Sequence, residues 1–215
     1  MAKSKNRKWI DRHVSDVYVR KSKSDGFRSR ASYKLLEILE SKPLIRRGDT
    51  VVDLGCAPGG WSQVAKAAVG NDGSVIGVDV LEMSPIPQTE FIQGDFSEKQ
   101  VLDRLRSKLE NKSVKLVMSD MAPNITGVSA IDLPAHYELV DLALEFCLVQ
   151  LSEGGHFIIK LFQGSGFDSA VNDIRKFFKK IKLIKPEASR KKSREVYLLG
   201  EYFRQQETKS EGVLK

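Results

Sequence analysis

Short apolar runs recur along the chain from residue 50 onward, and a longer amphipathic or polar segment separates each run from the next. Runs of this length, bounded by glycine, proline or polar residues, are typical of buried strands. The pattern predicts seven strands, over residues 50–54, 74–80, 90–93, 114–119, 156–162, 181–185 and 195–202.

The segments between these runs have the periodicity of helices. Residues 29–42 carry apolar side chains at Leu35, Leu36, Ile38 and Leu39 between charged residues, as an amphipathic helix does. Further helices are predicted over residues 61–69, 97–110, 132–151 and 168–180. We expect Ser97 to cap the 97–110 helix and the Gly154-Gly155 pair to stop the 132–151 helix.

Strands that alternate with helices favour an α/β fold, in which helices cover both faces of a mostly parallel sheet. In such sheets a ligand binds at the carboxyl ends of the strands, where the strand order reverses. The polar residues at the predicted strand ends are therefore the first candidates for function. They are Asp53, Asp79, Asp95, Asp120 and Lys160.

Charge is unevenly distributed along the 215 residues, a length that fits one compact domain. Residues 1–30 carry a net charge of +7 and residues 160–194 carry +8, whereas the total is also +7, so the rest of the chain carries −8. Two solvated surface runs would account for this pattern. If the fold brings the two basic blocks together, they form one surface suited to nucleic-acid phosphates.

Several classes of protein do not fit the sequence. Cys56 and Cys147 show no C-x-x-C pairing and no histidine cluster, so we expect neither a disulfide framework nor a metal, and a reducing compartment. The apolar runs are too short to span a bilayer, so no membrane contact is expected. The basic N-terminus lacks the apolar stretch of a secretory signal, and we expect a cytoplasmic location.

A glycine-rich turn over residues 55–60 follows the first predicted strand and opens a helix. Gly55, Gly59 and Gly60 allow a tight turn and close approach of the backbone to a ligand. The spacing is not that of a dinucleotide-binding motif, and Pro58 removes an N–H group that a pyrophosphate would need. The turn therefore favours a cofactor without phosphates, such as an adenosine that carries an amino-acid tail.

Two aspartates at the next strand ends suit such a ligand. Asp79 lies 24 residues after Gly55, where an acid accepts hydrogen bonds from ribose hydroxyls. Asp95 ends the third predicted strand and is placed to accept a bond from an adenine amino group. Trp61 is expected to form part of the wall of the pocket.

Four motifs carry a family resemblance, namely DLGCAPGGW, GVD, QGDF and SDMAPN, in this order and spacing. With SRASYKL at 29–35, KLFQGSGFD at 160–168 and SREVYLL at 193–199, they resemble methyltransferases of the FtsJ/RlmE type from about Trp9 to Tyr202. The resemblance implies a Rossmann-like class I fold with a seven-stranded sheet. It also implies transfer of a methyl group from S-adenosylmethionine to a uridine ribose 2′-hydroxyl in the A-loop of large-subunit (23S) ribosomal RNA, linked to late ribosome assembly.

The same resemblance assigns the site residues. Those expected to contact the cofactor are Gly59, Trp61, Asp79, Asp95 and Asp120, and the family's catalytic Lys-Asp-Lys-Glu tetrad falls on Lys34, Asp120, Lys160 and Glu195. Lys160 is the candidate base. Burial and a second cation lower the pKa of a lysine and favour this role, whereas nearby carboxylates raise the pKa and oppose it. The alternative is that Lys160 stays charged, orients the hydroxyl and stabilises developing alkoxide.

The basic blocks flank two members of this tetrad in the sequence. We expect Arg28, Arg30, Arg190, Lys191, Lys192 and Arg194 to bind RNA. The expected division is a basic N-terminal arm over residues 1–28, a methyltransferase domain over 29–203 and a polar C-terminal tail over 204–215, in a monomeric protein.

The sequence is also compatible with other functions. The tetrad specifies the reaction better than the substrate, so transfer RNA and the messenger RNA cap are alternative substrates. A non-catalytic RNA-binding factor for ribosome assembly is the alternative from another class. A base methyltransferase or a nicotinamide dehydrogenase fits less well, because the Asp120-Met121-Ala122-Pro123 strand end and Pro58 depart from their motifs.

Overall fold

The computed structural model describes residues 17–190 and 192–205. Most of the expected basic arm, Lys191 and most of the expected polar tail lie outside the described residues. The division of the chain at residues 28 and 203 stays a prediction.

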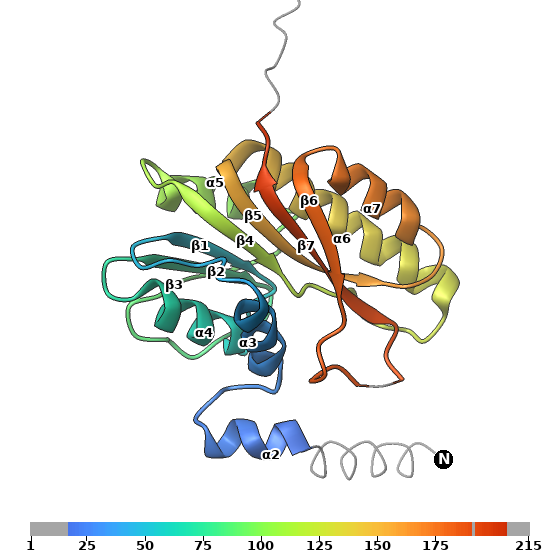
Figure 1. The fold of residues 1–215 in the computed structure, drawn as a ribbon, viewed down its shortest axis with the longest axis horizontal. Coiled ribbons are helices and arrows are strands. Elements are labelled where there is room, and N and C mark those ends of the chain that lie inside the picture. Colours follow the sequence, from blue (N-terminus) through green and yellow to red (C-terminus); the bar gives the residue numbers. More distant parts are fainter. Residues whose placement is uncertain (1–16, 191, 206–215) are drawn as a thin grey trace, which may run out of the picture.

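Seven strands form one sheet in the order β3-β2-β1-β4-β5-β7-β6 (Figure 1). They are β1 (Thr50–Leu54), β2 (Ser74–Asp79), β3 (Glu90–Gln93), β4 (Val114–Ser119), β5 (Leu151–Phe162), β6 (Phe178–Ile184) and β7 (Glu195–Phe203). Strands β1 to β5 pair in parallel, and β7 is antiparallel to both of its neighbours. The predicted Rossmann-like, mostly parallel sheet is confirmed.

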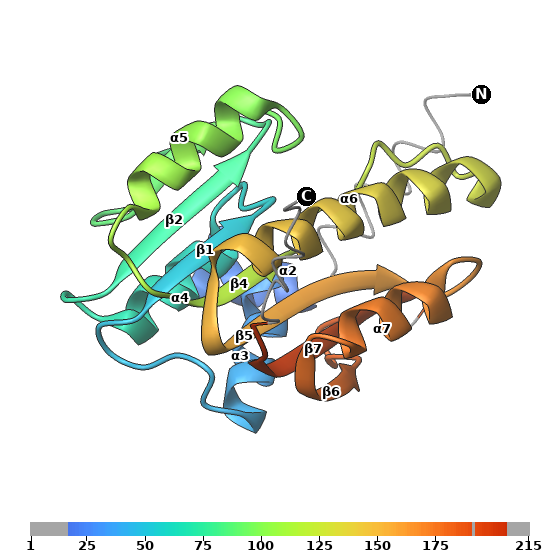
Figure 2. The same cartoon turned by 90° about the horizontal axis from the view of Figure 1, so that it is seen from above.

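Helices lie on both faces of the sheet (Figure 2). One face is covered by α3 (Ala31–Ser41) and α4 (Gly60–Val69), and α2 (Val17–Ser24) precedes them. The other is covered by α5 (Lys99–Leu109), α6 (Ser129–Gln150) and α7 (Phe167–Arg175). Because alternate residues of a strand point to opposite faces, neighbouring residues of β1 enter different cores, with Val51 packed beneath α3 and α4 and Val52 beneath the other three helices.

The long helix ends within one residue of the predicted Leu151, but the Gly154-Gly155 pair does not stop it. Helix α6 ends at Gln150 and β5 begins at Leu151. Leu151 pairs with Val114, and regular pairing with β4 resumes only at His156, so the two glycines lie in an irregularity of β5. Gly154 has a φ of 75°, which glycine adopts without strain because it has no Cβ atom. The glycines thus allow a bulge in the strand.

Two other helix boundaries also differ from the prediction. Ser97 does not cap α5, because its hydroxyl and backbone N–H both bind Asp95 Oδ1, and Glu98 takes the position before the helix. The helix predicted over 168–180 ends at Arg175, since Phe178 already belongs to β6 and pairs with Phe203. Long-range pairing with β7 prevails there over local helical periodicity.

Within the described residues, no helix is both long and apolar enough to cross a membrane. The same part of the chain contains no group of three or more histidine, cysteine, aspartate or glutamate side chains placed to hold a metal ion.

Candidate active site

A pocket of about 400 Å³ opens at the carboxyl ends of β1, β2, β3 and β4. The strand order reverses between β1 and β4, which is where ligands bind in sheets of this type. Carboxylates of Asp79, Asp95 and Asp120 line the pocket, and none of its lining residues is a lysine or arginine. Such a pocket suits a cationic or neutral ligand and disfavours a pyrophosphate.

The glycine-rich turn comes close to the strand end that carries Asp120. Gly55 has a φ of 76°, and a Cβ atom there would lie 2.8 Å from Met121 Cγ. Its N–H and that of Cys56 both donate to the carbonyl of Val78, at 2.9 and 3.2 Å. A side chain at residue 55 would therefore collide with Met121 in the segment after β4, and only glycine fits this turn.

Asp79 and Asp95 reach the pocket from neighbouring strand ends. Asp79 Oδ2 accepts a 2.8 Å bond from the N–H of Ala57, and Oδ1 accepts a 2.8 Å bond from the N–H of Leu81. Asp95 Oδ1 accepts hydrogen bonds from the backbone N–H and from the hydroxyl of Ser97. Both bonds lower the pKa of Asp95, and the backbone bond has the larger effect. Both carboxylates are held in place and retain lone pairs for a ligand.

Two of the expected cofactor residues lie outside this pocket. Gly59 precedes α4 with a φ of 106°, and a Cβ atom there would meet Ile86 and Met83. Trp61 is buried; its Nε1–H donates to the carbonyl of Ala31 at 2.8 Å. Trp61 does line a second hollow of about 220 Å³, which shares Gly55, Ala57 and Asp120 with the first. Their direct contact with a cofactor stays a prediction, and both residues shape the turn.

A buried carboxylate lies beneath the turn. Asp53 is fully buried in β1 and accepts a 2.6 Å bond from the hydroxyl of Ser62. Burial raises the pKa of Asp53 to about 7, the Ser62 bond opposes this rise, and the charges of Asp120 and Asp79 add to it. Asp53 therefore keeps its proton at pH values at which an ordinary aspartate is ionised, and it supports the turn from below.

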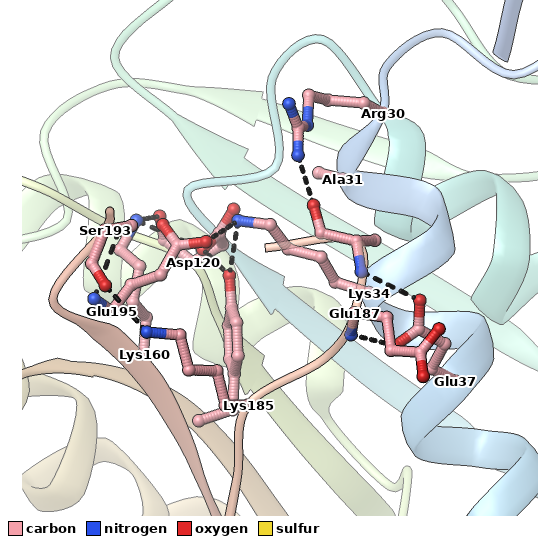
Figure 3. A network of polar contacts seen from close by, with 12 residues as sticks. Arg30, Ala31, Lys34, Glu37, Asp120, Lys160, Lys185, Glu187, Ser193 and Glu195 are labelled. Atoms are coloured by element: carbon pink, nitrogen blue, oxygen red, sulfur yellow. Dashed lines mark hydrogen bonds and ion pairs between the residues drawn. The ribbon is translucent and has the colours of Figure 1, made fainter. Parts of the chain in front are cut away.

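The four predicted catalytic residues converge beside the pocket (Figure 3). Lys34 Nζ lies 2.6 Å from Glu195 Oε1, and Lys160 Nζ lies 3.1 Å from Asp120 Oδ1. Lys160 Nζ also donates to the backbone carbonyl of Asp120 at 2.5 Å. These residues come from α3, β7, β5 and the end of β4, so only the folded sheet brings them together.

Tyr197 connects the two ion pairs, and it is absent from the residues that the sequence motifs predicted. Its hydroxyl donates to Asp120 Oδ1 at 2.8 Å and accepts a bond from Lys34 Nζ at 3.1 Å. The signal was present, because Tyr197 follows Glu195 by two residues in a strand and so points to the same face. Burial and the neighbouring carboxylates of Asp120 and Glu195 raise the pKa of Tyr197, which stays a neutral phenol.

The charge state of Asp120 follows from its neighbours. Desolvation raises the pKa of this carboxyl, but the ammonium groups of Lys160 and Lys34 and the bond from Tyr197 outweigh it, so the pKa lies below its usual value. Asp120 is ionised at neutral pH. Its carboxylate places one negative charge between the pocket and the two lysines.

Basic side chains surround the outer side of this cluster. A hollow of about 460 Å³ is lined by Arg30, Lys34, Arg190, Lys192 and Glu195, together with Ala31 and Ser193. Arg30 donates to the carbonyl of Ala188. Glu37 accepts bonds from the N–H groups of Glu187 and Ala188, at 2.6 and 3.0 Å, so α3 anchors the loop between β6 and β7 (Figure 3).

Arg28 and Arg194 make contacts within the protein. The guanidinium of Arg28 donates to the carbonyls of Pro58, Ser84 and Pro85. Arg194 Nη1 lies 3.2 Å from the hydroxyl of Ser129, at the start of α6. Arg28 therefore fastens the glycine-rich turn to the loop after β2, whereas Arg30, Arg190 and Lys192 line the hollow.

Comparisons with known proteins agree with this arrangement. A family model described as FtsJ-like methyltransferase matches residues 27–203. The chain is 52% identical to Ribosomal RNA large subunit methyltransferase E of Pseudomonas fluorescens strain Pf0-1, over 95% of this chain and 98% of that protein. It is 51% identical to the protein of the same name from Nitrosospira multiformis, over 89% and 93% of the two chains.

A solved structure gives the same result. The crystal structure of a protein described as a ribosomal RNA methyltransferase from Plasmodium falciparum matches with a TM-score of 0.73 and 29% identity, covering 84% of this chain and all of that one. The region that the family model matches includes the glycine-rich turn and all four residues of the tetrad. The chain belongs to the FtsJ-like methyltransferase family.

Proposed function

We propose that this protein transfers a methyl group from S-adenosylmethionine to the ribose 2′-hydroxyl of a uridine in large-subunit ribosomal RNA. The observation that carries the proposal is the convergence of Lys34, Asp120, Lys160 and Glu195 next to an acidic pocket at the switch point of the sheet. The names of the relatives from Pseudomonas fluorescens and Nitrosospira multiformis support the choice of RNA.

The pocket fits S-adenosylmethionine by volume and charge. About 400 Å³ lies within the usual range for ligand pockets, and three carboxylates match a ligand that carries a sulfonium and an ammonium group but no phosphate. Asp79 would accept the ribose hydroxyls, Asp95 the adenine amino group, and Asp120 would lie near the sulfonium. When bound, this cofactor supplies a methyl group that is already activated for transfer.

The tetrad then has to orient a weakly acidic hydroxyl. Lys160 Nζ donates to two acceptors, the carboxylate and the carbonyl of Asp120. An ammonium has three N–H donors, so one is left for the ribose oxygen. Lys160 thus orients the hydroxyl and stabilises negative charge that develops on its oxygen. Asp120 Oδ1 is taken by Tyr197 and Lys160, which leaves Oδ2 to accept a hydrogen bond from the hydroxyl and then to take its proton as the oxygen gains the methyl group.

Lys34 and Glu195 support this arrangement from the side of the tetrad that faces the basic hollow, over which we expect RNA to approach. Lys34 is 8% exposed, and its ammonium group forms an ion pair with Glu195 and donates a hydrogen bond to the hydroxyl of Tyr197. Glu195 also lines the basic hollow. We infer that this pair holds Tyr197 and Asp120 in place and borders the position of the target nucleotide. Transfer is then accelerated by proximity and alignment of the reacting groups, without a covalent intermediate on the protein.

RNA would approach over the basic hollow beside the tetrad. Arg30, Arg190 and Lys192 line it, and Arg194 and Lys191 belong to the same segment of sequence. Arginine and lysine bind phosphates without reading sequence. We propose that these residues hold the RNA backbone, that Arg28 acts through the cofactor turn, and that the protein acts as a cytoplasmic monomer without a metal.

The direct test is methyl transfer to isolated large ribosomal subunits from cells that lack this activity. With radiolabelled S-adenosylmethionine, we expect label in 23S RNA and a 2′-O-methyluridine in the A-loop. Transfer RNA and capped messenger RNA serve as competing substrates in the same assay. Preferential labelling of either one would contradict the ribosomal substrate, and the absence of transfer to any RNA would favour a non-catalytic binding protein.

A further inference from the structure

An exposed apolar surface borders the candidate active site. Three branched aliphatic side chains in the segment between β4 and the first turn of α6 are more than half exposed, namely Ile125 (58%), Val128 (51%) and Ile131 (57%). We call these three residues the apolar lip. Single exposed aliphatic residues are ordinary, but three within a stretch of seven residues make this segment a candidate interaction surface.

The apolar lip continues directly from the catalytic centre. Ile125 follows Pro123 and Asn124, which line the acidic pocket, and Asp120 begins the same segment. Figure 2 shows the first turns of α6 at the end of the molecule toward which β5 points. The lip therefore lies at the carboxyl edge of the sheet, which is also the edge that carries Asp120 and Lys160.

The segment that carries the lip is held by hydrogen bonds. Asp132 Oδ1 accepts bonds from the backbone N–H and the hydroxyl of Thr126, at 2.8 and 2.7 Å, and Asp132 Oδ2 accepts one from the N–H of Gly127 at 2.9 Å. These bonds lower the pKa of Asp132, beginning with the backbone bond from Thr126, so they persist at neutral pH. The apolar side chains are thus presented from an ordered turn.

A basic residue joins the lip to the RNA side of the tetrad. Arg194 lies beside Glu195, and its guanidinium contacts the hydroxyl of Ser129 between Val128 and Ile131. The carbonyl of Arg194 accepts a bond from the N–H of Gln163 at 3.0 Å, just after β5. One cationic group therefore lies beside the apolar lip at the border of the site, and this combination suits a ligand that carries both bases and phosphates.

We propose that the apolar lip packs against unpaired nucleobases next to the methylated ribose and thereby keeps the target nucleotide out of a base stack. Apolar side chains such as isoleucine insert between bases in other protein–nucleic acid complexes and unstack them. The side chains of Lys160 and Asp120 are only 9% and 22% exposed, so a nucleotide that has left its base stack approaches them more closely than one held in a regular helix. This inference rests on the proposed RNA function and names the part of the RNA that the lip contacts.

The test separates base contacts from phosphate contacts. The variant Val128→Ser/Ile131→Ser removes two members of the lip without opening the core. Its matched control is Val149→Ser, which is 63% exposed on the same helix and lies about 27 Å along the axis from Ile131. Each protein is titrated with a short oligouridylate and with the same ribose–phosphate chain lacking bases.

We expect the wild type and Val149→Ser to prefer the oligouridylate. In Val128→Ser/Ile131→Ser this preference should fall by about tenfold, a loss that corresponds to burial of one or two aliphatic groups. The salt dependence of binding should not change, because no phosphate contact is removed. On large ribosomal subunits, KM should rise while the affinity for S-adenosylmethionine stays the same.

Three results would overturn the inference. An unchanged preference for bases in the double variant would show that the lip does not touch them. A wild type that sediments as a dimer, with a monomeric double variant, would assign the lip to a second copy of this chain. A change confined to cofactor affinity would make the lip part of the acidic pocket. Failure of the wild type to methylate any RNA would instead contradict the proposed function itself.

Discussion

The phenol of Tyr197 lies between Lys34 and Asp120, with a 3.1 Å bond to the first and a 2.8 Å bond to the second. The two ion pairs of the tetrad are therefore one connected network. Replacing Tyr197 by phenylalanine removes the bridge but neither charge pair. Because hydrogen bonds to charged groups contribute about 1.5–3 kcal/mol, we expect the free energy of unfolding to fall by that amount. Urea titration measures the loss, and an unchanged stability would show that the bridge has no energetic weight.

Lys160→Ala should reduce methyl transfer by about 10²- to 10³-fold, because it removes the donor proposed to stabilise charge on the ribose oxygen. Cofactor affinity should be retained, since Lys160 does not line the acidic pocket. A single-turnover assay with radiolabelled cofactor measures the rate, and calorimetry measures the affinity. The control is Lys180→Ala, an exposed lysine of β6. Wild-type transfer by Lys160→Ala would remove this residue from the mechanism.

Asp79→Ala should weaken binding of S-adenosylmethionine by about 10- to 100-fold, the range expected for lost hydrogen bonds to a charged group. Asp79 also holds the N–H groups of Ala57 and Leu81, so circular dichroism has to verify the fold. Asp79→Asn keeps one acceptor and should lie between wild type and alanine. Asp103→Ala, on the surface of α5, provides the control. Equal calorimetric affinities would contradict the assignment of Asp79 to the cofactor.

Asp53 predicts a pH dependence of stability. Its pKa is raised to about 7 by burial, so the folded state keeps a proton that the unfolded state loses near pH 4. The contribution of Asp53 is therefore fully present below about pH 4 and is lost as the pH rises towards 7. Asp53→Asn should flatten this decline, with urea unfolding compared at about pH 5 and pH 8.5. Parallel pH profiles for both proteins would argue against a raised pKa.

Arg190→Ala/Lys192→Ala tests the basic hollow. If each side chain neutralises one phosphate, the slope of log K against log salt should become shallower by about 1.4 for single-stranded RNA. Filter binding at several salt concentrations measures the slope. Lys99→Ala/Arg106→Ala removes the same charge from α5 and should leave the slope unchanged. Equal effects of both pairs would indicate that net charge alone attracts the RNA.

The strands were largely predictable from the sequence, whereas some boundaries were not. Residues 50–54, 90–93 and 114–119 form strands with the predicted bounds, because each is a short apolar run between polar or glycine residues. The bulge in β5 and the start of β6 depend on pairing with strands that are distant in the sequence. Local periodicity contains no information on such pairing.

The candidate site shows the same division. Motif similarity predicted the four residues of the tetrad, and the positions at strand ends predicted the three aspartates that line the pocket. Neither revealed that Gly59 and Trp61 lie outside the acidic pocket or that Tyr197 joins the ion pairs. Those relationships depend on which side chains meet across α3, α4 and β7, and spacing along the chain does not specify such contacts.

Arg28 has a consequence for the way in which the N-terminal residues can be studied. Through three carbonyls it links the stretch ahead of α3 to Pro58 in the glycine-rich turn and to Ser84 and Pro85. A truncated protein that starts after Arg28 would lose this fastening along with the basic residues. Weaker RNA binding by such a truncation would therefore combine lost phosphate contacts with a loosened cofactor pocket, and only point substitutions separate the two.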